Sequence, residues 1–296
     1  MLVGLSPLHT FMSSSDVLEV MVVNGKDIWV ERTNGTTHVG ELTTTEIAMV
    51  VEGISRLSGR RVDTLSPILD ARLPDGSRAC VVLSPIAVHG TSVNIRKFPQ
   101  RVLPLAAFGS EKLCEQVREL IVSRANVVVS GETSSGKTSL LSAATEWFSP
   151  HDRVVCVEDT TEIRFKHDHV VSLQTRPANQ EGMGCVSLQD LVRTSLRMRP
   201  DRVIVGEVRG PEVVDMLLAL SSGHSGSWST VHAPSAARTT DRLVSLVQRH
   251  HPQWTHRDAD RLVRGALNAV IHITRLPTGK RVITDVLALQ SRTQTS

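Results

Sequence analysis

The spacing of apolar and polar residues divides the chain into two regions that predict different architectures. Residues 1–98 alternate short apolar runs with turn sequences and one helical pattern, as expected of a mixed α/β domain. From about residue 105 onward, apolar runs of strand length alternate with helical patterns. That order is typical of a parallel sheet covered by helices on both faces.

The first region contains two hairpin patterns and one capped helix. Asn24-Gly25 separates two apolar runs, at 17–23 and 28–30, which is the pattern of a tight hairpin. Thr43 and Glu46 have the spacing of a capping box and predict the start of a helix. The remaining expected features are a helix face of Ile47, Val50, Val51, Ile54 and Leu57, strands at 68–73 and 78–83 around a turn at 74–77, and a strand at 91–97.

The second region begins after a segment bracketed by Pro99 and Pro104. Proline breaks regular structure and stiffens a connection, so we expect a first domain at 1–98, a linker at 99–106 and a second domain at 107–296. The expected strands are 127–129, 154–157, 170–173, 203–205 and 228–231. The expected helices are 112–123, 188–198, 212–220 and 258–269, followed by a hairpin of 270–275 and 281–289.

Composition narrows the functional classes. The 296 residues carry 33 basic and 30 acidic side chains, a balance that does not by itself indicate a nucleic-acid partner. Aromatic residues make up 3% and tyrosine is absent, so a base-stacking RNA surface is not expected. The four cysteines form no Cys-x-x-Cys pair, so we expect neither a zinc site nor a disulfide framework. No signal peptide and no membrane-spanning run is apparent.

The strongest chemical pattern follows the apolar run 127–129. It has the form Gly-x-x-x-x-Gly-Lys-Thr, in which glycines let backbone N–H groups cradle phosphates and the next helix directs its positive end at the same anion. Lys137 is expected to reach the β- and γ-phosphates of ATP, and the Thr138 hydroxyl to ligate Mg²⁺. The alternative is a Gly/Ser loop that only connects a strand to a helix and binds no nucleotide. The expected nucleotide-binding residues are Gly131, Glu132, Thr133, Ser134, Ser135, Gly136, Lys137, Thr138 and Ser139.

Two later strands end in carboxylates. Glu158 and Asp159 close one strand and could hold Mg²⁺ or a water, although a solvated strand-end turn is an equal alternative. The other strand resembles a Walker B strand, but Gly206 occupies the usual aspartate position. Glu207 follows it and is placed to orient the attacking water. The alternative is that Glu207 only pairs with Arg209 or another base.

Two histidines flank the strand at 228–231. His232 could contact the γ-phosphate or its water as a sensor, and His224 could shape the preceding loop. A histidine on a strand is more often structural when nothing else points to function. Zinc is not expected, because no third or fourth ligand has suitable spacing.

Taken in order, these four segments resemble the Walker A, Asp box, atypical Walker B and His box of the type II and type IV secretion ATPases. The match covers about residues 16–290, and finer phrases resemble the Flp/Tad pilus assembly branch. Those phrases are 59–63, 70–78, 95–98, 175–177 and 197–202.

The resemblance implies a small PAS-like mixed α/β domain followed by a RecA-like P-loop domain. It implies a homohexameric cytoplasmic ring that docks on an inner-membrane platform protein, without a membrane span of its own. It also implies that Arg72 and Arg96, with Arg78 as a weaker candidate, complete the ATP site. The alternative for these arginines is ordinary surface charge.

This chain departs from the family pattern at several positions. Ser134 replaces a glycine, which is tolerable only if the residue does not need a positive φ. Trp228 and Pro234 replace an aliphatic residue and an asparagine in the His box. The long N-terminal extension of many relatives is also missing, which leaves docking to the platform in doubt.

The sequence therefore predicts an ATPase with Glu207, Glu158, Lys137, His232, Arg72 and Arg96 as its catalytic set. Thr138 would bind Mg²⁺ directly, and Glu158 and Glu207 would do so through water. Movement of the first domain about residues 102–105 would deliver the mechanical output. The alternatives are a type IV secretion or DNA-uptake motor, a recombinase-type translocase, and a non-hydrolysing nucleotide-binding scaffold.

Overall fold

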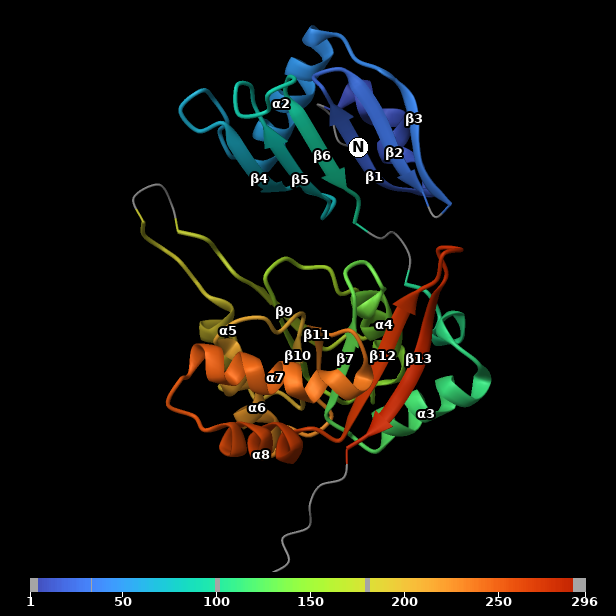
Figure 1. Cartoon of the computed structure of the whole chain (residues 1–296), viewed down its shortest axis with the longest axis vertical. Helices are drawn as coiled ribbons and strands as arrows, with labels where there is room; N and C mark the ends of the chain where they lie inside the picture. The colour runs from blue at the N-terminus through green and yellow to red at the C-terminus, as the bar shows by residue number, and fades with distance from the viewer. Residues whose placement is uncertain (1–4, 33, 99–101, 179–181, 290–296) are drawn as a thin grey trace, which may run out of the picture. The chain divides into compact units, whose positions relative to one another are not determined.

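The computed structural model describes residues 5–32, 34–98, 102–178 and 182–289, and the chain divides into two compact units, 1–101 and 102–296 (Figure 1). The linker predicted at 99–106 falls partly on residues 99–101, which lie outside the described residues. Leu105 and Phe108 belong to a short 3-10 helix, η2 (Leu105–Phe108), and are buried in the core of the second unit.

The first unit is one antiparallel sheet of six strands in the order β3-β2-β1-β6-β5-β4. One face of the sheet packs on α2 (Thr44–Ser58) and on the short helices η1 (Ser6–Leu8) and α1 (His9–Ser13). The strands are β1 (Val17–Val23), β2 (Asp27–Arg32), β3 (Gly35–Glu41), β4 (Ile68–Arg72), β5 (Arg78–Val82) and β6 (Ser92–Arg96).

Local sequence explains most of this unit. Asn24 and Gly25 both adopt left-handed φ, as the predicted tight hairpin between β1 and β2 requires. The capping box is confirmed: the Thr43 N–H donates to the Glu46 carboxylate at 2.8 Å. Strand β3 was not predicted, because its Gly-Thr-Thr-His-Val-Gly-Glu sequence lacks apolar alternation and its side chains are mostly exposed. Pairing along the edge of β2 forms it instead.

The second unit is a seven-stranded sheet in the order β13-β12-β7-β11-β10-β8-β9. The strands from β12 to β9 run parallel, and β13 joins the edge antiparallel to β12. The strands are β7 (Val127–Gly131), β8 (Val154–Glu158), β9 (Val170–Gln174), β10 (Arg202–Val205), β11 (Trp228–His232), β12 (Ala269–Arg275) and β13 (Arg281–Ala288).

Helices cover both faces of this sheet, as predicted. The core that contains Val127 and Val129 includes side chains of α3 and α4, and the core that contains Val128 includes those of α5 to α8. The helices are α3 (Glu111–Val122), α4 (Lys137–Ala144), α5 (Leu188–Ser195), α6 (Glu212–Ser221), α7 (Ala236–His250) and α8 (His256–Ala266), with a short 3-10 helix η3 (Thr145–Trp147).

Two predicted helices needed correction, and one helix was missed. The helix expected at 258–269 spans His256–Ala266, because Leu267 turns to extended backbone and Ala269 begins β12. The helix expected at 188–198 ends at Ser195, before Arg199 takes a left-handed φ. Helix α7 was not predicted, because polar threonines occupy part of its buried face. Within the described part of the chain, no helix combines the length and apolarity needed to cross a membrane.

Candidate active site

The phosphate loop lies between α4 and β7, a fully buried interior strand of the sheet. A Cβ on Gly131 would lie 2.5 Å from the Ser135 Oγ and collide with the Ile273 carbonyl, and one on Gly136 would collide with the Arg281 side chain. Glycine is therefore required at both positions. No side chain caps the start of α4, which leaves its first N–H groups available to an anion.

A buried hydroxyl in this loop also fits a bound phosphate. The Oγ of Ser135 is buried and has no hydrogen-bond partner among the described residues. An unsatisfied buried hydroxyl is costly, and a phosphate oxygen in the loop would satisfy it. The loop thus fits the nucleotide predicted from its sequence.

A serine in place of the family's glycine at position 134 is tolerable only if the residue does not need a positive φ, and the structure does not meet this condition. The φ of Ser134 is 60°, in the left-handed region that glycine adopts more easily. The loop keeps the conformation of a glycine although the residue carries a side chain. That side chain is exposed, so the cost is backbone strain rather than a steric clash.

Lys137 is buried inside the loop. Its Nζ donates to the carbonyl oxygens of Gly131 at 3.0 Å and Glu132 at 2.8 Å. Burial lowers the pKa of Lys137, and the negative charges of Glu207 and Glu162 oppose that shift. The ammonium is thus held at the loop, with two carboxylates as its charged neighbours.

Glu207 and His232 come together at the carboxyl ends of β10 and β11. His232 Nε2 lies 3.2 Å from Glu207 Oε1, and Arg209 Nη1 lies 3.9 Å from Glu207 Oε2. Arg209 also pairs with Asp159. Burial lowers the pKa of His232, the Lys137 charge lowers it further, and Glu207 raises it. The neutral imidazole is therefore favoured beside a carboxylate that is partly open to solvent.

His224 does not join this cluster. Its Nδ1 lies 3.3 Å from the carbonyl oxygen of Ala219, at the end of α6. Ser227 Oγ donates to the His224 carbonyl oxygen at 2.8 Å, which closes the turn before β11. The predicted role of His224 in shaping this loop agrees with these contacts.

Glu158 is placed differently from the expectation that it would hold metal-bound water. Its side chain is only 3% exposed, and Oε1 accepts hydrogen bonds from the backbone N–H groups of Glu162 at 2.9 Å and Ile163 at 3.1 Å. Burial raises the pKa of Glu158 to about 7, and the two N–H groups offset part of that rise. Its carboxyl group is turned into the protein: Oε1 is occupied by the two backbone donors, and Oε2 lies 3.6 Å from the Cys156 Sγ, whose thiol donates to it.

Two residues near this site were not predicted from the sequence. The charge of Glu162 acts on Lys137, and the available signal was the third acid of the Glu-Asp-Thr-Thr-Glu segment. Arg281 of β13 packs on Gly136, and its Nη1 lies 3.4 Å from the Ser139 Oγ. Arg281 could not be found from sequence, because 142 positions separate it from Ser139.

The first unit holds a row of arginines at one end of its sheet. In the strand register, Arg72 of β4 lies opposite Arg78 of β5, and Arg78 lies opposite Arg96 of β6. All three are exposed, on the face opposite the one that packs on α2. This register gathers three positive charges at one end of the sheet.

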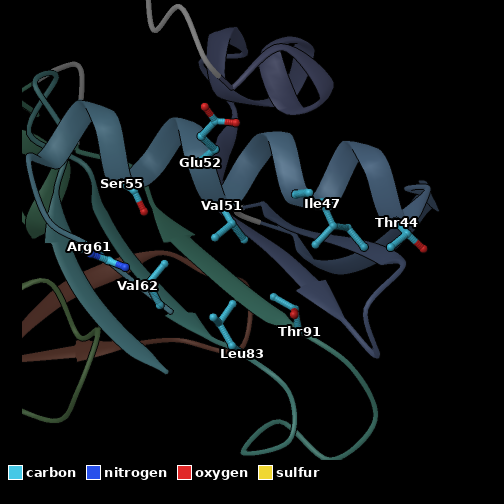
Figure 2. A pocket seen from close by; sticks show the side chains of 10 residues that line it. Thr44, Ile47, Val51, Glu52, Ser55, Arg61, Val62, Leu83 and Thr91 are labelled. Atoms are coloured by element: carbon cyan, nitrogen blue, oxygen red, sulfur yellow. The ribbon is translucent and has the colours of Figure 1, made fainter. Parts of the chain in front are cut away.

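The first unit also carries a groove of about 480 Å³ along α2, where Ile47 and Val51 face Leu83 (Figure 2). Its lining contains none of the predicted site residues. Three exposed or half-buried residues, Asp27, His38 and Glu41, could together meet a metal ion, but Lys26 Nζ already lies 3.3 Å from Glu41 Oε1. Neither feature belongs to the phosphate site.

A largely parallel sheet with a glycine-rich phosphate loop after an interior strand, and with acids and a histidine at the ends of other strands, defines a P-loop protein of the RecA-like class. Residues 2–294 match the family model described as type II/IV secretion system protein. The chain belongs to this family of secretion ATPases.

Similar proteins agree with this assignment. A putative conjugal transfer protein of Mycobacterium tuberculosis is 32% identical over 98% of this chain and 85% of its own length. The type IV secretion system protein PtlH of Bordetella pertussis is 32% identical over 83% of this chain and 81% of its own length.

Solved structures show the same two-domain fold. The VirB11 ATPase from the Brucella suis type IV secretion system, crystallised with sulphate, is 25% identical with a TM-score of 0.53, covering 96% of this chain and 93% of its own. The pilus retraction motor PilT with bound ADP is 20% identical with a TM-score of 0.69, covering 97% of this chain and 83% of its own.

Proposed function

We propose that this protein is an ATP-hydrolysing motor that powers assembly of a Flp/Tad-type pilus or protein secretion. Family membership supports the ATPase activity, and the sequence phrases around Arg72, Arg96 and Arg197 support the pilus branch. The single observation that carries the proposal is the pairing of His232 Nε2 with Glu207 Oε1 at 3.2 Å. The Glu207 charge also raises the pKa of Lys137 in the phosphate loop.

The residues divide the chemistry among them. Glu207 orients the water that attacks the γ-phosphate, and neutral His232 holds the Glu207 carboxylate and reports on the phosphate. Lys137 leaves the two loop carbonyls for the β- and γ-phosphates. Thr138 would ligate Mg²⁺, with Glu207 reaching the ion through water, and the ion would neutralise phosphate charge.

Arg72 and Arg96 would supply cations to the transferred phosphoryl group. Arginines in this role contribute several orders of magnitude in rate. The row formed with Arg78 supports this assignment, because it concentrates positive charge at one end of one sheet. The rotation about residues 102–105 that would bring these arginines into play is part of the same proposal.

The assembly around the motor follows from the family resemblance. We propose a homohexamer at the cytoplasmic face of the inner membrane, docked on a platform protein, with no nucleic-acid partner. Mass measurement with and without nucleotide tests the ring. A monomer that hydrolyses ATP at full rate at every concentration would contradict it.

The names of the relatives favour a second task, conjugal transfer or type IV secretion. The motor chemistry would be the same, and the cargo would differ. Deletion of the gene in its host separates the two tasks: loss of surface pili supports the first, and loss of conjugal transfer or effector export with pili intact supports the second.

The activity itself is tested with Glu207→Gln. We expect a fall in kcat of about 1,000-fold, within the range for losing a general base, while ATP still binds. Glu119→Gln is the matched control, because Glu119 is exposed on α3 and remote in sequence from every motif of the site. Equal rates in the parent and Glu207→Gln would overturn the assignment.

A further inference from the structure

The end of β8 and the end of β10 fit together through one glycine. The strands pair in parallel with Val157 opposite Val205, so Glu158 and Gly206 follow at adjacent positions. A Cβ on Gly206 would lie 2.7 Å from Glu158 Cγ and 3.3 Å from Glu158 Oε1. The Glu158 side chain therefore occupies the space in which a Walker B aspartate side chain would begin.

The same side chain holds the loop that follows β8. Its Oε1 accepts from the backbone N–H groups of Glu162 and Ile163, four and five residues further along the chain. Those bonds close residues 158–163 into a compact turn. The turn holds the backbone of Glu162, and the negative charge of the Glu162 side chain raises the pKa of Lys137 in the phosphate loop.

We propose that Glu158 is a positioning residue that enters through the gap left by Gly206 and holds Glu162 at the phosphate loop. This inference rests on the proposed ATPase function for its kinetic readout, and on the structure alone for its second readout. The proposal explains why glycine replaces the Walker B aspartate at position 206: any side chain there would displace Glu158, which holds the neighbouring loop.

A positioning role for Glu158 can be distinguished by experiment from a role in which its negative charge acts on metal-bound water. A carbonyl oxygen of glutamine accepts the same two N–H bonds and has nearly the same shape, but it carries no negative charge. If Glu158 acts by position, glutamine restores what alanine removes. If it acts by charge, glutamine and alanine fail alike.

The experiment compares Glu158→Ala, Glu158→Gln and Gly206→Ala in the full chain. For Glu158→Ala and Gly206→Ala we expect kcat to fall about 100-fold, the scale of a misplacement of about 1 Å. Glu158→Gln should recover most of that loss. Adding Glu158→Ala to a Glu162→Gln background should lower kcat little further, because both changes act through Glu162. Failure of Glu158→Gln to recover activity, or full additivity in the double variant, would overturn the proposal.

Hydrogen exchange gives the readout that needs no catalysis. The amides of Glu162 and Ile163 should exchange about tenfold faster in Glu158→Ala and Gly206→Ala, since each loses a bond to a buried acceptor, but not in Glu158→Gln. Unchanged exchange in Glu158→Ala would refute the positioning role. A parent protein without ATPase activity but with this exchange pattern would refute the proposed function and leave the positioning role standing.

Discussion

Glu158 and Glu207 lie at the ends of neighbouring parallel strands, yet they occupy opposite environments. Glu158 is 3% exposed and its Oε1 accepts bonds from two backbone N–H groups, whereas the Glu207 side chain is 31% exposed and faces His232 and Arg209. The two acids are chemically alike. Their partners, and not their positions in a motif, are the basis of the roles we propose: Glu158 holds a loop, and Glu207 orients water at the phosphate.

The largest expected effect on stability comes from the charge of the buried acid. Raising the pKa of Glu158 from 4.5 to about 7 means that the folded protein holds this proton more tightly than the unfolded chain. The corresponding stability is present below about pH 4.5 and is lost as the pH rises through about 7, a change of about 3 kcal/mol.

Glu158→Gln removes that titration. The melting temperature of the variant should therefore rise relative to the parent between pH 5 and pH 8. A pH-independent difference for Glu158→Gln would contradict the burial of the charge.

Gly206→Ala tests the steric half of the comparison. The new methyl group overpacks Glu158 Cγ, and the expected loss of stability is about 2 kcal/mol, typical of a buried side chain forced to shift. Thermal unfolding measures it. Gly265→Ala is the control, because a Cβ there meets no atom within 4 Å. Equal behaviour of the two variants would show that Glu158 does not fill the space over residue 206.

His232→Ala tests the exposed acid. Loss of the imidazole removes the partner 3.2 Å from Glu207, and kcat should fall about tenfold while ATP affinity stays within a few-fold. His224→Ala is the control, since His224 lies at the end of α6 and contacts a backbone carbonyl instead. A loss of ATP affinity without a loss of kcat would assign His232 to binding rather than to the water.

The smallest effect concerns the phosphate loop. Ser134→Gly should stabilise the protein by about 1 kcal/mol, because glycine adopts a φ of 60° without the backbone strain that a residue with a Cβ incurs. Differential scanning calorimetry without nucleotide measures it. Ser139→Gly is the contrasting substitution, since Ser139 lies inside α4 and glycine should destabilise it.

Local patterns predicted the fold well where hydrophobic spacing was clear. The β1–β2 hairpin, the capping box of α2 and the alternation of strands and helices along the second unit all follow from residues close in sequence. Strand β3 and helix α7 were missed, since polar side chains dilute their periodicity and pairing or packing with distant segments forms them.

The residues of the phosphate loop could be predicted from the sequence, but the surroundings of other site residues could not. The phosphate loop is one contiguous motif, so its residues were named from sequence. The environments of Glu158 and Arg281 were not, because each depends on a glycine brought close by strand register: Gly206 for Glu158 and Gly136 for Arg281. The left-handed φ of Ser134 was also hidden, because a motif fixes residue types and not backbone angles.

The most direct test compares glutamate-to-glutamine substitutions at the ends of β8 and β10. Single-turnover ATP hydrolysis would be measured for Glu158→Gln and Glu207→Gln under identical conditions, with nucleotide binding measured on the same samples. We expect both variants to bind ATP, Glu207→Gln to lose about 1,000-fold in the chemical step, and Glu158→Gln to keep most of its rate. Equal loss in the two variants, or the greater loss in Glu158→Gln, would contradict the division of roles between the buried and the exposed acid.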